Sequence, residues 1–165
     1  MDFSSTFISY LTEAAGENNT HAALDALSGK ASVSVRLNPA KLKPADNDMA
    51  GRIFSMKTSQ VPWSPYGFFL ESRPQFTLDP LMHAGCYYVQ DSSAMFVGTV
   101  FRQALRSMQT VHRPLRVLDL CAAPGGKTTD ILASLRMSGL ESYILVSNEV
   151  MKQRAAILSD NAGIW

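Results

Sequence analysis

The stretch between residues 115 and 137 restricts the fold of this chain more than any other part of the sequence. The run LRVLDL, at 115–120, is short and densely apolar, which is typical of a strand buried in a parallel sheet. The residues CAAPGG follow it, and most of them are very small. Residues 128–137 then have a helical composition, and Gly139 is expected to end the helix. The predicted order is a strand, a turn of small residues and a helix.

A second strand and a second helix follow. The run SYILVSNE, at 142–149, predicts another buried strand, and the residues from Val150 to about Asn161 can form a helix. This β-α-β-α order predicts the start of an open, doubly wound α/β sheet. We therefore expect 86–165 to form the first, incomplete part of a Rossmann-like domain. Residues 1–85 are expected to form a small α+β region that precedes it.

The first 85 residues show shorter patterns. Apolar residues at helical spacing predict a helix over 2–15, capped by Ser4 or Ser5, and a second helix over 20–27. A proline-rich segment, 61–80, excludes a long helix and leaves room for a short strand over 68–71. The run SVSVRLNP predicts a half-buried strand, with Val33, Val35 and Leu37 on the inner face and Ser34, Arg36 and Asn38 on the outer face.

The residues from 91 to 108 predict an amphipathic helix. Asp91 or Ser92 can cap its N-terminus, and Arg102 and Arg106 fall mostly on its polar face. The apolar face, which we expect to be buried, consists of Met95, Phe96, Val100, Phe101, Ala104, Leu105 and Met108.

The small-residue turn resembles two phosphate-binding loops but matches neither. A P-loop needs a glycine five residues before Gly126, and that position holds Cys121. Pro124 also removes a backbone N–H from the part of the loop that would surround phosphate. A dinucleotide fingerprint needs three spaced glycines, whereas Gly125 and Gly126 are adjacent.

A third ligand, S-adenosylmethionine, fits the turn better because it carries no phosphate. Ala122, Ala123, Gly125 and Gly126 allow a ligand to approach the backbone closely. The N-terminus of the following helix offers free N–H groups to the carboxylate of this ligand. Glu149, at the end of the second strand, can accept hydrogen bonds from both ribose hydroxyls. The alternative is ordinary strand-turn-helix packing, in which Glu149 is only an acid at a helix N-terminus.

Charge and cysteine usage restrict the partners. The net charge is +1, but residues 30–57 hold six bases and two acids, and residues 102–116 hold four arginines and no acid. Such runs suit a phosphate-rich partner, although charge runs more often form a solvated surface. The two cysteines and three histidines are isolated, so neither a disulfide framework nor a metal site is expected. No apolar run is long enough to span a membrane, and we expect a cytoplasmic protein.

Several of these segments also resemble, in the same order, segments of one known protein family. LDLCAAPGGKTT resembles the first motif of the Sun-family RNA (cytosine-5) methyltransferases. SVRLNP, VPWSPYGFFLE and HAGCYYVQDSSAM resemble the segments that lead into the catalytic domain of that family, so that the resemblance covers about 33–165. The version found here looks most like the bacterial enzymes that methylate small-subunit ribosomal RNA.

The resemblance implies a cofactor, S-adenosyl-L-methionine, and a set of residues that hold it. Those residues are Cys121, Ala122, Ala123, Pro124, Gly125, Gly126, Lys127 and Glu149, with Arg154 as a residue that can brace the site. It also implies that RNA is the partner, as small-subunit ribosomal RNA or a ribosomal subunit, that no metal takes part, and that the full-length protein is a monomer. By analogy with the family, residues 1–85 are expected to dock RNA, and the candidate phosphate contacts are Arg36, Lys41, Lys43, Arg102 and Arg106.

The implied mechanism uses residues that this chain does not contain. In the family, a cysteine thiolate attacks C6 of cytosine, which makes C5 able to take a methyl group, and a second cysteine helps to release the product. The target base must lie outside a helix or be flipped out of it. The Pro-Cys and Thr-Cys motifs that supply these cysteines are missing from this sequence. Cys86 matches no catalytic motif and Cys121 matches a cofactor-loop position, so we expect no catalytic residue here.

These departures suggest the N-terminal part of an enzyme, with a non-catalytic RNA- or cofactor-binding module as the alternative. Since a two-stranded parallel sheet exposes apolar faces and an unpaired edge, we expect the 165-residue chain to be marginally stable and to bind the methyl donor weakly. It should transfer no methyl group to ribosomal RNA. A methyl-transfer assay with the purified chain checks this, and measurable turnover would contradict it.

Overall fold

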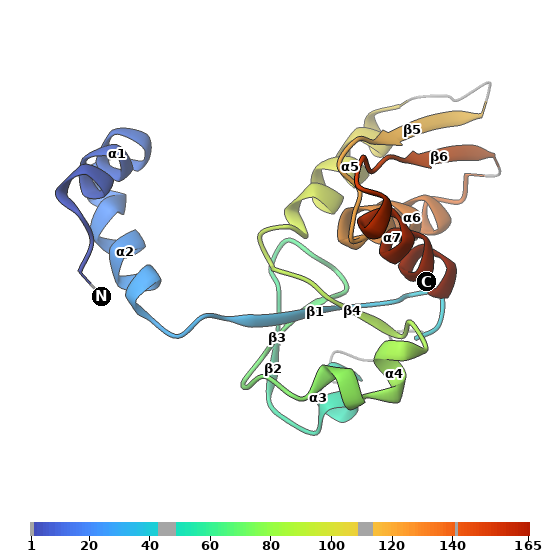
Figure 1. Cartoon of the computed structure of the whole chain (residues 1–165), viewed down its shortest axis with the longest axis horizontal. Coiled ribbons are helices and arrows are strands. Elements are labelled where there is room, and N and C mark those ends of the chain that lie inside the picture. Colours follow the sequence, from blue (N-terminus) through green and yellow to red (C-terminus); the bar gives the residue numbers. More distant parts are fainter. Residues whose placement is uncertain (1, 43–48, 109–113, 141) are drawn as a thin grey trace. The chain divides into compact units, whose positions relative to one another are not determined.

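The structure is a computed structural model that describes residues 2–42, 49–108, 114–140 and 142–165. The chain divides into two compact units, residues 1–32 and residues 33–165 (Figure 1).

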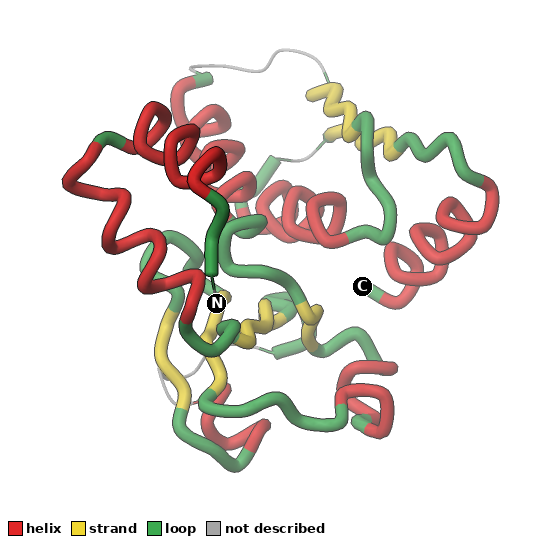
Figure 2. Tube along the Cα trace, turned by 60° about the vertical axis from the view of Figure 1, so that its left-hand side comes forward, coloured by secondary structure: helices red, strands yellow, loops and turns green. Residues whose placement is uncertain are grey.

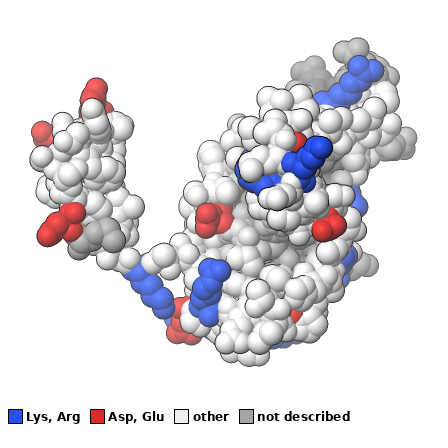
Figure 3. All heavy atoms as spheres, viewed as in Figure 1, with Lys and Arg blue, Asp and Glu red and all other residues white. Residues whose placement is uncertain are grey.

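The first unit is a pair of helices, α1 (Ser5–Ala15) and α2 (Glu17–Ser28). Ser4 caps α1 by accepting a hydrogen bond from the N–H of Phe7 at 3.2 Å, as the sequence predicts. Thr20, the buried residue of α2, donates a hydrogen bond to the hydroxyl of Thr12 at 3.3 Å and so joins the two helices. Residues 1–29 contain four acids and no Lys or Arg, and Figure 3 shows acidic side chains on the helix pair.

The second unit begins with a four-stranded antiparallel sheet in the order β2-β3-β1-β4. The strands are β1 (Val33–Leu37), β2 (Thr58–Gln60), β3 (Gly67–Leu70) and β4 (Tyr87–Val89). Three short helical segments accompany them: α3 (Met49–Phe54), the 3-10 helix η1 (Phe76–Leu78) and α4 (Pro80–His83). One face of the sheet packs on a core that includes the rings of Phe54, Phe76 and Tyr87.

The predicted half-buried character of β1 is wrong. Ser34, Arg36 and Asn38, which we expected on a solvated face, are all buried, as are Val35 and Leu37. The face of β1 that we expected to be solvated is covered by other segments of the same chain. Arg36 hydrogen bonds to Thr129, and Asn38 donates from Nδ2 to the carbonyl oxygens of Gly85 and Trp165 at 3.0 Å each.

The second part of this unit contains a parallel pair of strands, β5 (Leu115–Asp119) and β6 (Tyr143–Ser147). Helix α6 (Gly126–Met137) connects them, and α7 (Lys152–Ile164) follows β6. Figure 2 shows this alternation of strands and helices, in which α5 (Phe96–Ser107) precedes β5. The β-α-β-α order is therefore the one that the sequence predicts. One face of the strand pair is open, since Leu118, Ile144 and Val146 are each more than half exposed.

Helix α5 packs differently from the expectation. It begins at Phe96 without a side-chain cap, so neither Asp91 nor Ser92 has the predicted capping role. Phe96 and Val100 of the predicted buried face are 54% and 53% exposed, although Met95, just before the helix, is fully buried. Helix α5 contacts α6 through Gly98 and Arg102. Asp130 of α6 attracts the arginine, and Gly98, which has no side chain, leaves room for the Asp130 carboxylate.

Among the described helices, none combines the length and the apolar character needed to cross a membrane.

The close contact at Gly98 generates a stability prediction. A Cβ at this position would lie 2.2 Å from Oδ2 of Asp130, a buried carboxylate that cannot move without losing its arginine partners. We expect Gly98→Ala to lower the free energy of unfolding by about 1–3 kcal/mol, as overpacking does. Denaturant unfolding followed by circular dichroism measures this.

Gly163→Ala is the matched control, because it replaces a helical glycine that has open space around it. This change should be neutral or stabilising by up to about 1 kcal/mol. Equal effects of the two substitutions would mean that Gly98 does not determine the contact between α5 and α6.

Candidate functional site

The turn of small residues follows β5 and is fixed to the end of β6 by Asn148. The backbone N–H of Asn148 donates to the carbonyl oxygen of Asp119 at 2.8 Å, and its Nδ2 donates to that of Leu120 at 3.0 Å. The N–H of Ala122 donates back to the carbonyl oxygen of Asn148 at 3.0 Å. The carboxyl ends of the two parallel strands therefore meet at the turn, which is where ligands bind in open α/β sheets.

Gly125 closes the turn in a backbone conformation that favours glycine. Its φ angle is +117°, and a Cβ there would lie 3.3 Å from Cβ of Asn161. Its carbonyl oxygen accepts hydrogen bonds from the N–H and the hydroxyl of Thr129. Nδ2 of Asn161 donates to the carbonyl oxygen of Pro124 at 2.7 Å, and the peptide bond before Pro124 is cis. The turn is thus held from both α6 and α7.

Glu149 and the turn are brought together by Arg154. Nη2 of Arg154 donates to the carbonyl oxygen of Ala123 at 2.9 Å, while its Nη1 lies 3.8 Å from Oε2 of Glu149. The other carboxylate oxygen of Glu149 accepts from the N–H of Met151 at 3.0 Å. Arg154 thus contacts both Glu149 and the turn, and its bracing role in a donor site stays a prediction.

The N-terminus of α6 lacks a side-chain cap. Thr128, in its first turn, donates its hydroxyl to Oδ2 of Asp119 at 2.7 Å, and both residues are buried. The corresponding hydroxyl of a P-loop binds Mg²⁺. Because the Thr128 hydroxyl is occupied inside the protein, the geometry favours an uncapped helix end that can receive a carboxylate over a triphosphate loop.

The predicted loop residues differ in their exposure. Cys121 and Pro124 are exposed, Gly126 and Lys127 are half-buried, and the other three residues are buried: Ala122, Ala123 and Gly125. Cys121 is a free cysteine. Within the described ranges, no three His, Cys, Asp or Glu side chains are grouped so that they could hold a metal ion.

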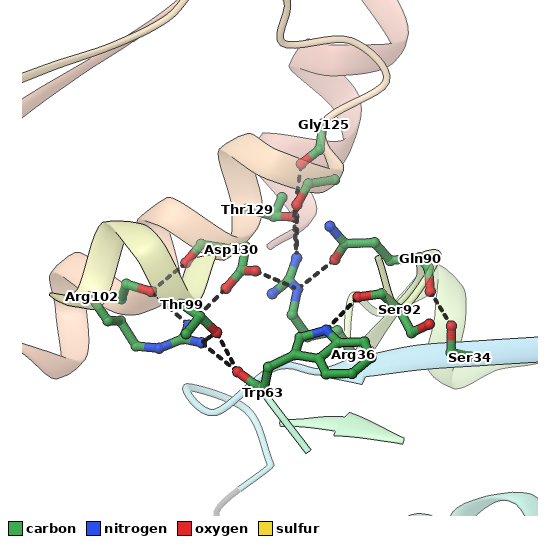
Figure 4. Close-up of polar contacts among 12 residues, drawn as sticks. Ser34, Arg36, Trp63, Gln90, Ser92, Thr99, Arg102, Gly125, Thr129 and Asp130 are labelled. Atoms are coloured by element: carbon green, nitrogen blue, oxygen red, sulfur yellow. Dashed lines mark hydrogen bonds and ion pairs between the residues drawn. The ribbon is translucent and has the colours of Figure 1, made fainter. Parts of the chain in front are cut away.

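A buried arginine connects the antiparallel sheet to the helix that carries the turn. Arg36 on β1 is fully buried, and its Nε donates to Oε1 of Gln90 at 2.8 Å. Its Nη2 donates to the hydroxyl of Thr129 at 2.6 Å and to the carbonyl oxygen of Gly126 at 3.2 Å. Figure 4 shows this side chain reaching up from β1 toward α6. Arg36 therefore contacts the first turn of α6, directly after the small-residue turn.

Asp130 supplies the opposite charge in this network. Its Oδ2 lies 3.8 Å from Nε of Arg36, and its Oδ1 lies 3.3 Å from Nη1 of Arg102 on α5 (Figure 4). Burial lowers the pKa of Arg36 to about 10, although Asp130 opposes this effect, so the guanidinium stays protonated at neutral pH. Burial also raises the pKa of Asp130, while both arginines act in the opposite direction. Two positive charges and one negative charge thus meet in the interior.

The candidate phosphate contacts differ in their exposure and in their bonds within the protein. Arg36 is wrong as an RNA contact, because it is fully buried and bonded within the protein. Lys41 donates to the carbonyl oxygens of Ala84 and Ile164, and Lys43 lies outside the described residues. Arg102 is partly exposed but paired with Asp130, whereas Arg106 is exposed.

Sequence reasoning missed several residues that build the site. Asn148 and Asn161 hold the turn through their side-chain amides, and Gln90 and Asp130 complete the Arg36 network. Asn148 had a usable signal, since it directly follows the second strand that the sequence predicts. The others depend on contacts between segments distant in the sequence, which local patterns do not reveal.

Comparison with known proteins connects this geometry to a family. A family model described as the N-terminal domain of 16S rRNA methyltransferase RsmF matches residues 3–92. Two curated relatives carry the name ribosomal RNA small subunit methyltransferase F. The one from Aeromonas salmonicida is 34% identical over 132 residues, and one from Escherichia coli is 30% identical over 134 residues. Each match covers 78% of this chain and 26% of the relative, so the chain spans about a quarter of their length.

Solved structures share the fold. A methyltransferase homologue from Pyrococcus horikoshii superposes with a TM-score of 0.72 at 23% identity, over 98% of this chain and 49% of that protein. NSun6 from the same organism, crystallised with SFG, gives a TM-score of 0.68 at 12% identity, over 98% of this chain and 62% of that protein.

The Arg36 network generates a further prediction. Arg36→Gln leaves Asp130 with one fewer cation in the interior, so we expect a loss of about 3 kcal/mol in the free energy of unfolding. Arg116→Gln is the control, because it removes the same charge from an exposed strand position and should cost less than about 0.5 kcal/mol. Urea denaturation of both variants tests this, and similar midpoints would show that the buried pairing contributes nothing.

Proposed function

Because the chain belongs to the family of 16S rRNA methyltransferase RsmF, within the Sun family, we propose that it supplies the methyl-donor-binding part of a ribosomal RNA methyltransferase. The donor that we propose is S-adenosyl-L-methionine. The observation that carries the proposal is the convergence of the small-residue turn, the uncapped start of α6 and the Glu149 carboxylate. The activity itself is proposed for the whole protein, since the chain spans about a quarter of the length of its curated relatives.

The residues present fit this donor chemically. Ala122, Ala123 and Gly125 keep the turn free of large side chains. The uncapped N-terminus of α6 suits the carboxylate of the donor, because backbone N–H groups and the helix dipole both favour negative charge there. Glu149 stands at the end of β6, where an acid can accept hydrogen bonds from ribose hydroxyls. NSun6, with its SFG ligand, supports the choice, since SFG is an analogue of S-adenosylmethionine.

Each protein group has a defined role in this proposal. Glu149 orients the ribose, the turn from Cys121 to Lys127 supports the donor with its backbone, and Arg154 fixes the spacing between the two. When bound, the donor supplies an electrophilic methyl group. The chain's contribution is therefore binding and orientation.

We further propose cytosine C5 as the methylated atom and ribosomal RNA, free or within the small subunit, as the substrate. The family resemblance supports this chemistry. The sequence holds neither the Pro-Cys nor the Thr-Cys motif, and Cys121 lies in the proposed donor site, so the attacking thiolate is not assigned to this chain. We propose residues 86–165 as the truncated Rossmann-like part of the enzyme and residues 1–85 as the preceding region.

The donor assignment is tested by isothermal titration calorimetry. The chain should bind S-adenosylmethionine and should not bind ATP, because Pro124 and the internal bond of Thr128 leave no phosphate cradle. Glu149→Gln should weaken donor binding about tenfold or more, as expected when hydrogen bonds to a charged group are lost.

Glu13→Gln on α1 is the control, since it removes an exposed carboxylate from the helical unit and should leave the affinity unchanged. Binding of ATP in preference to S-adenosylmethionine would refute the proposal.

A further inference from the structure

A groove of about 650 Å³ lies away from the proposed donor site, between the segment that joins β2 to β3 and helix α5. The side chains that matter in it are Gln60, Trp63, Arg102, Gln103 and Arg106. A second hollow of about 660 Å³ shares Pro65 and both arginines and continues along α6. The two hollows therefore adjoin each other, with the arginines in their common wall, and together they are called the channel here.

The charge in this channel is positive. Arg102 and Arg106 line both hollows, and no acidic side chain lines either of them among the described residues. Asp130 lies behind Arg102 and is 2% exposed, and it faces two arginines at once. One carboxylate cannot neutralise two guanidinium groups, so Asp130 does not cancel the positive charge that Arg102 and Arg106 give the channel wall. A polyanion is the ligand that this charge favours.

Trp63 gives the channel a fixed aromatic surface. Its indole Nε1 donates to the carbonyl oxygen of Ser92 at 2.7 Å, and its own carbonyl oxygen accepts from Thr99 and from Arg102 (Figure 4). The residue nevertheless remains 36% exposed. A ring held in one orientation and open on one side can stack on a planar ligand with little loss of side-chain entropy.

The combination of a fixed ring and arginines is typical of sites for single-stranded nucleic acids. In such sites the bases stack on aromatic side chains and the backbone follows positive charge. A paired base cannot reach Trp63, because its faces are already stacked within a helix. The exposed Gln103 adds an amide that can both donate and accept hydrogen bonds at a base edge.

We propose that this channel binds single-stranded RNA, with one unpaired base stacked on Trp63 and the adjoining phosphate on Arg106, next to the positive charge of Arg102. The inference rests on the proposed function in that it identifies the form of RNA that this part of the enzyme holds. An acidic peptide also suits the charge, but it makes no use of the fixed indole ring.

Fluorescence anisotropy with the 165-residue chain and a labelled, non-complementary octaribonucleotide tests the proposal. Trp63→Leu should weaken binding about fivefold or more, whereas Trp63→Phe, which keeps an aromatic face, should stay within about twofold of the unchanged chain. Arg106→Gln should reduce the slope of log affinity against log salt by about 0.7. Arg116→Gln, an equal change of charge outside the channel, should leave the slope unchanged.

Two competitors complete the experiment. A duplex of the same sequence and an octaglutamate peptide should each displace the labelled strand less well than the unlabelled strand does. Displacement by octaglutamate that equals the unlabelled strand would overturn the proposal, and so would unchanged binding by Trp63→Leu and Arg106→Gln. Should Trp63→Leu fail to fold by circular dichroism, Trp63→Phe and Arg106→Gln decide, since Arg106 is exposed.

Calorimetry with S-adenosylmethionine separates this inference from the proposed function. Every channel variant should bind the donor as the unchanged chain does, because no channel residue lies in the turn or at Glu149. If the channel variants bind RNA as the unchanged chain does while donor binding is normal, only the RNA-binding proposal is refuted. If the chain does not bind S-adenosylmethionine but the channel variants weaken RNA binding as expected, only the donor assignment is refuted.

Discussion

The arrangement of the second unit depends on the guanidinium of Arg36, buried between β1 and α6. A charge in this position is costly to desolvate, and contacts with Gln90, Thr129 and Asp130 offset part of that cost. These partners come from β4's end and from α6, so the antiparallel sheet and the turn-bearing helix are bonded through one side chain. The attraction of Asp130 for Arg102 then brings in α5, and Gly98 allows the approach.

This network lies directly behind the proposed donor site. Arg36 bonds to the carbonyl oxygen of Gly126, and Thr129 bonds to both Arg36 and Gly125, so the first turn of α6 is fixed from inside the protein. From the other side, Asn161 and Arg154 hold the carbonyl oxygens of Pro124 and Ala123. A turn held in this way can present its backbone to a ligand without first becoming ordered, which lowers the entropic cost of binding.

Local patterns in the sequence predict the order of strands and helices in the second part of the chain, but not which side chains are buried between them. The β-α-β-α order, the cap at Ser4 and the family follow from periodicity and motif, because these depend on neighbouring residues. The alternation in SVSVRLNP predicts a solvated face for Arg36, which is wrong because alternation cannot distinguish solvent from a second buried face. The amphipathic pattern of α5 is confirmed only in part: Met95 is buried, whereas Phe96 and Val100 are more than half exposed and Arg102 pairs with the buried carboxylate of Asp130. The roles of Glu149 and the small-residue turn in donor binding remain predictions.

The central claim is that the turn and Glu149 form a donor site in this chain. Amide chemical-shift mapping of the ¹⁵N-labelled chain during titration with S-adenosylmethionine tests it most directly. The account predicts that the largest changes fall on residues 121–127 and 149–151, with small changes in the α1–α2 pair. Changes that avoid the turn and Glu149, or that are centred on the antiparallel sheet, would contradict it.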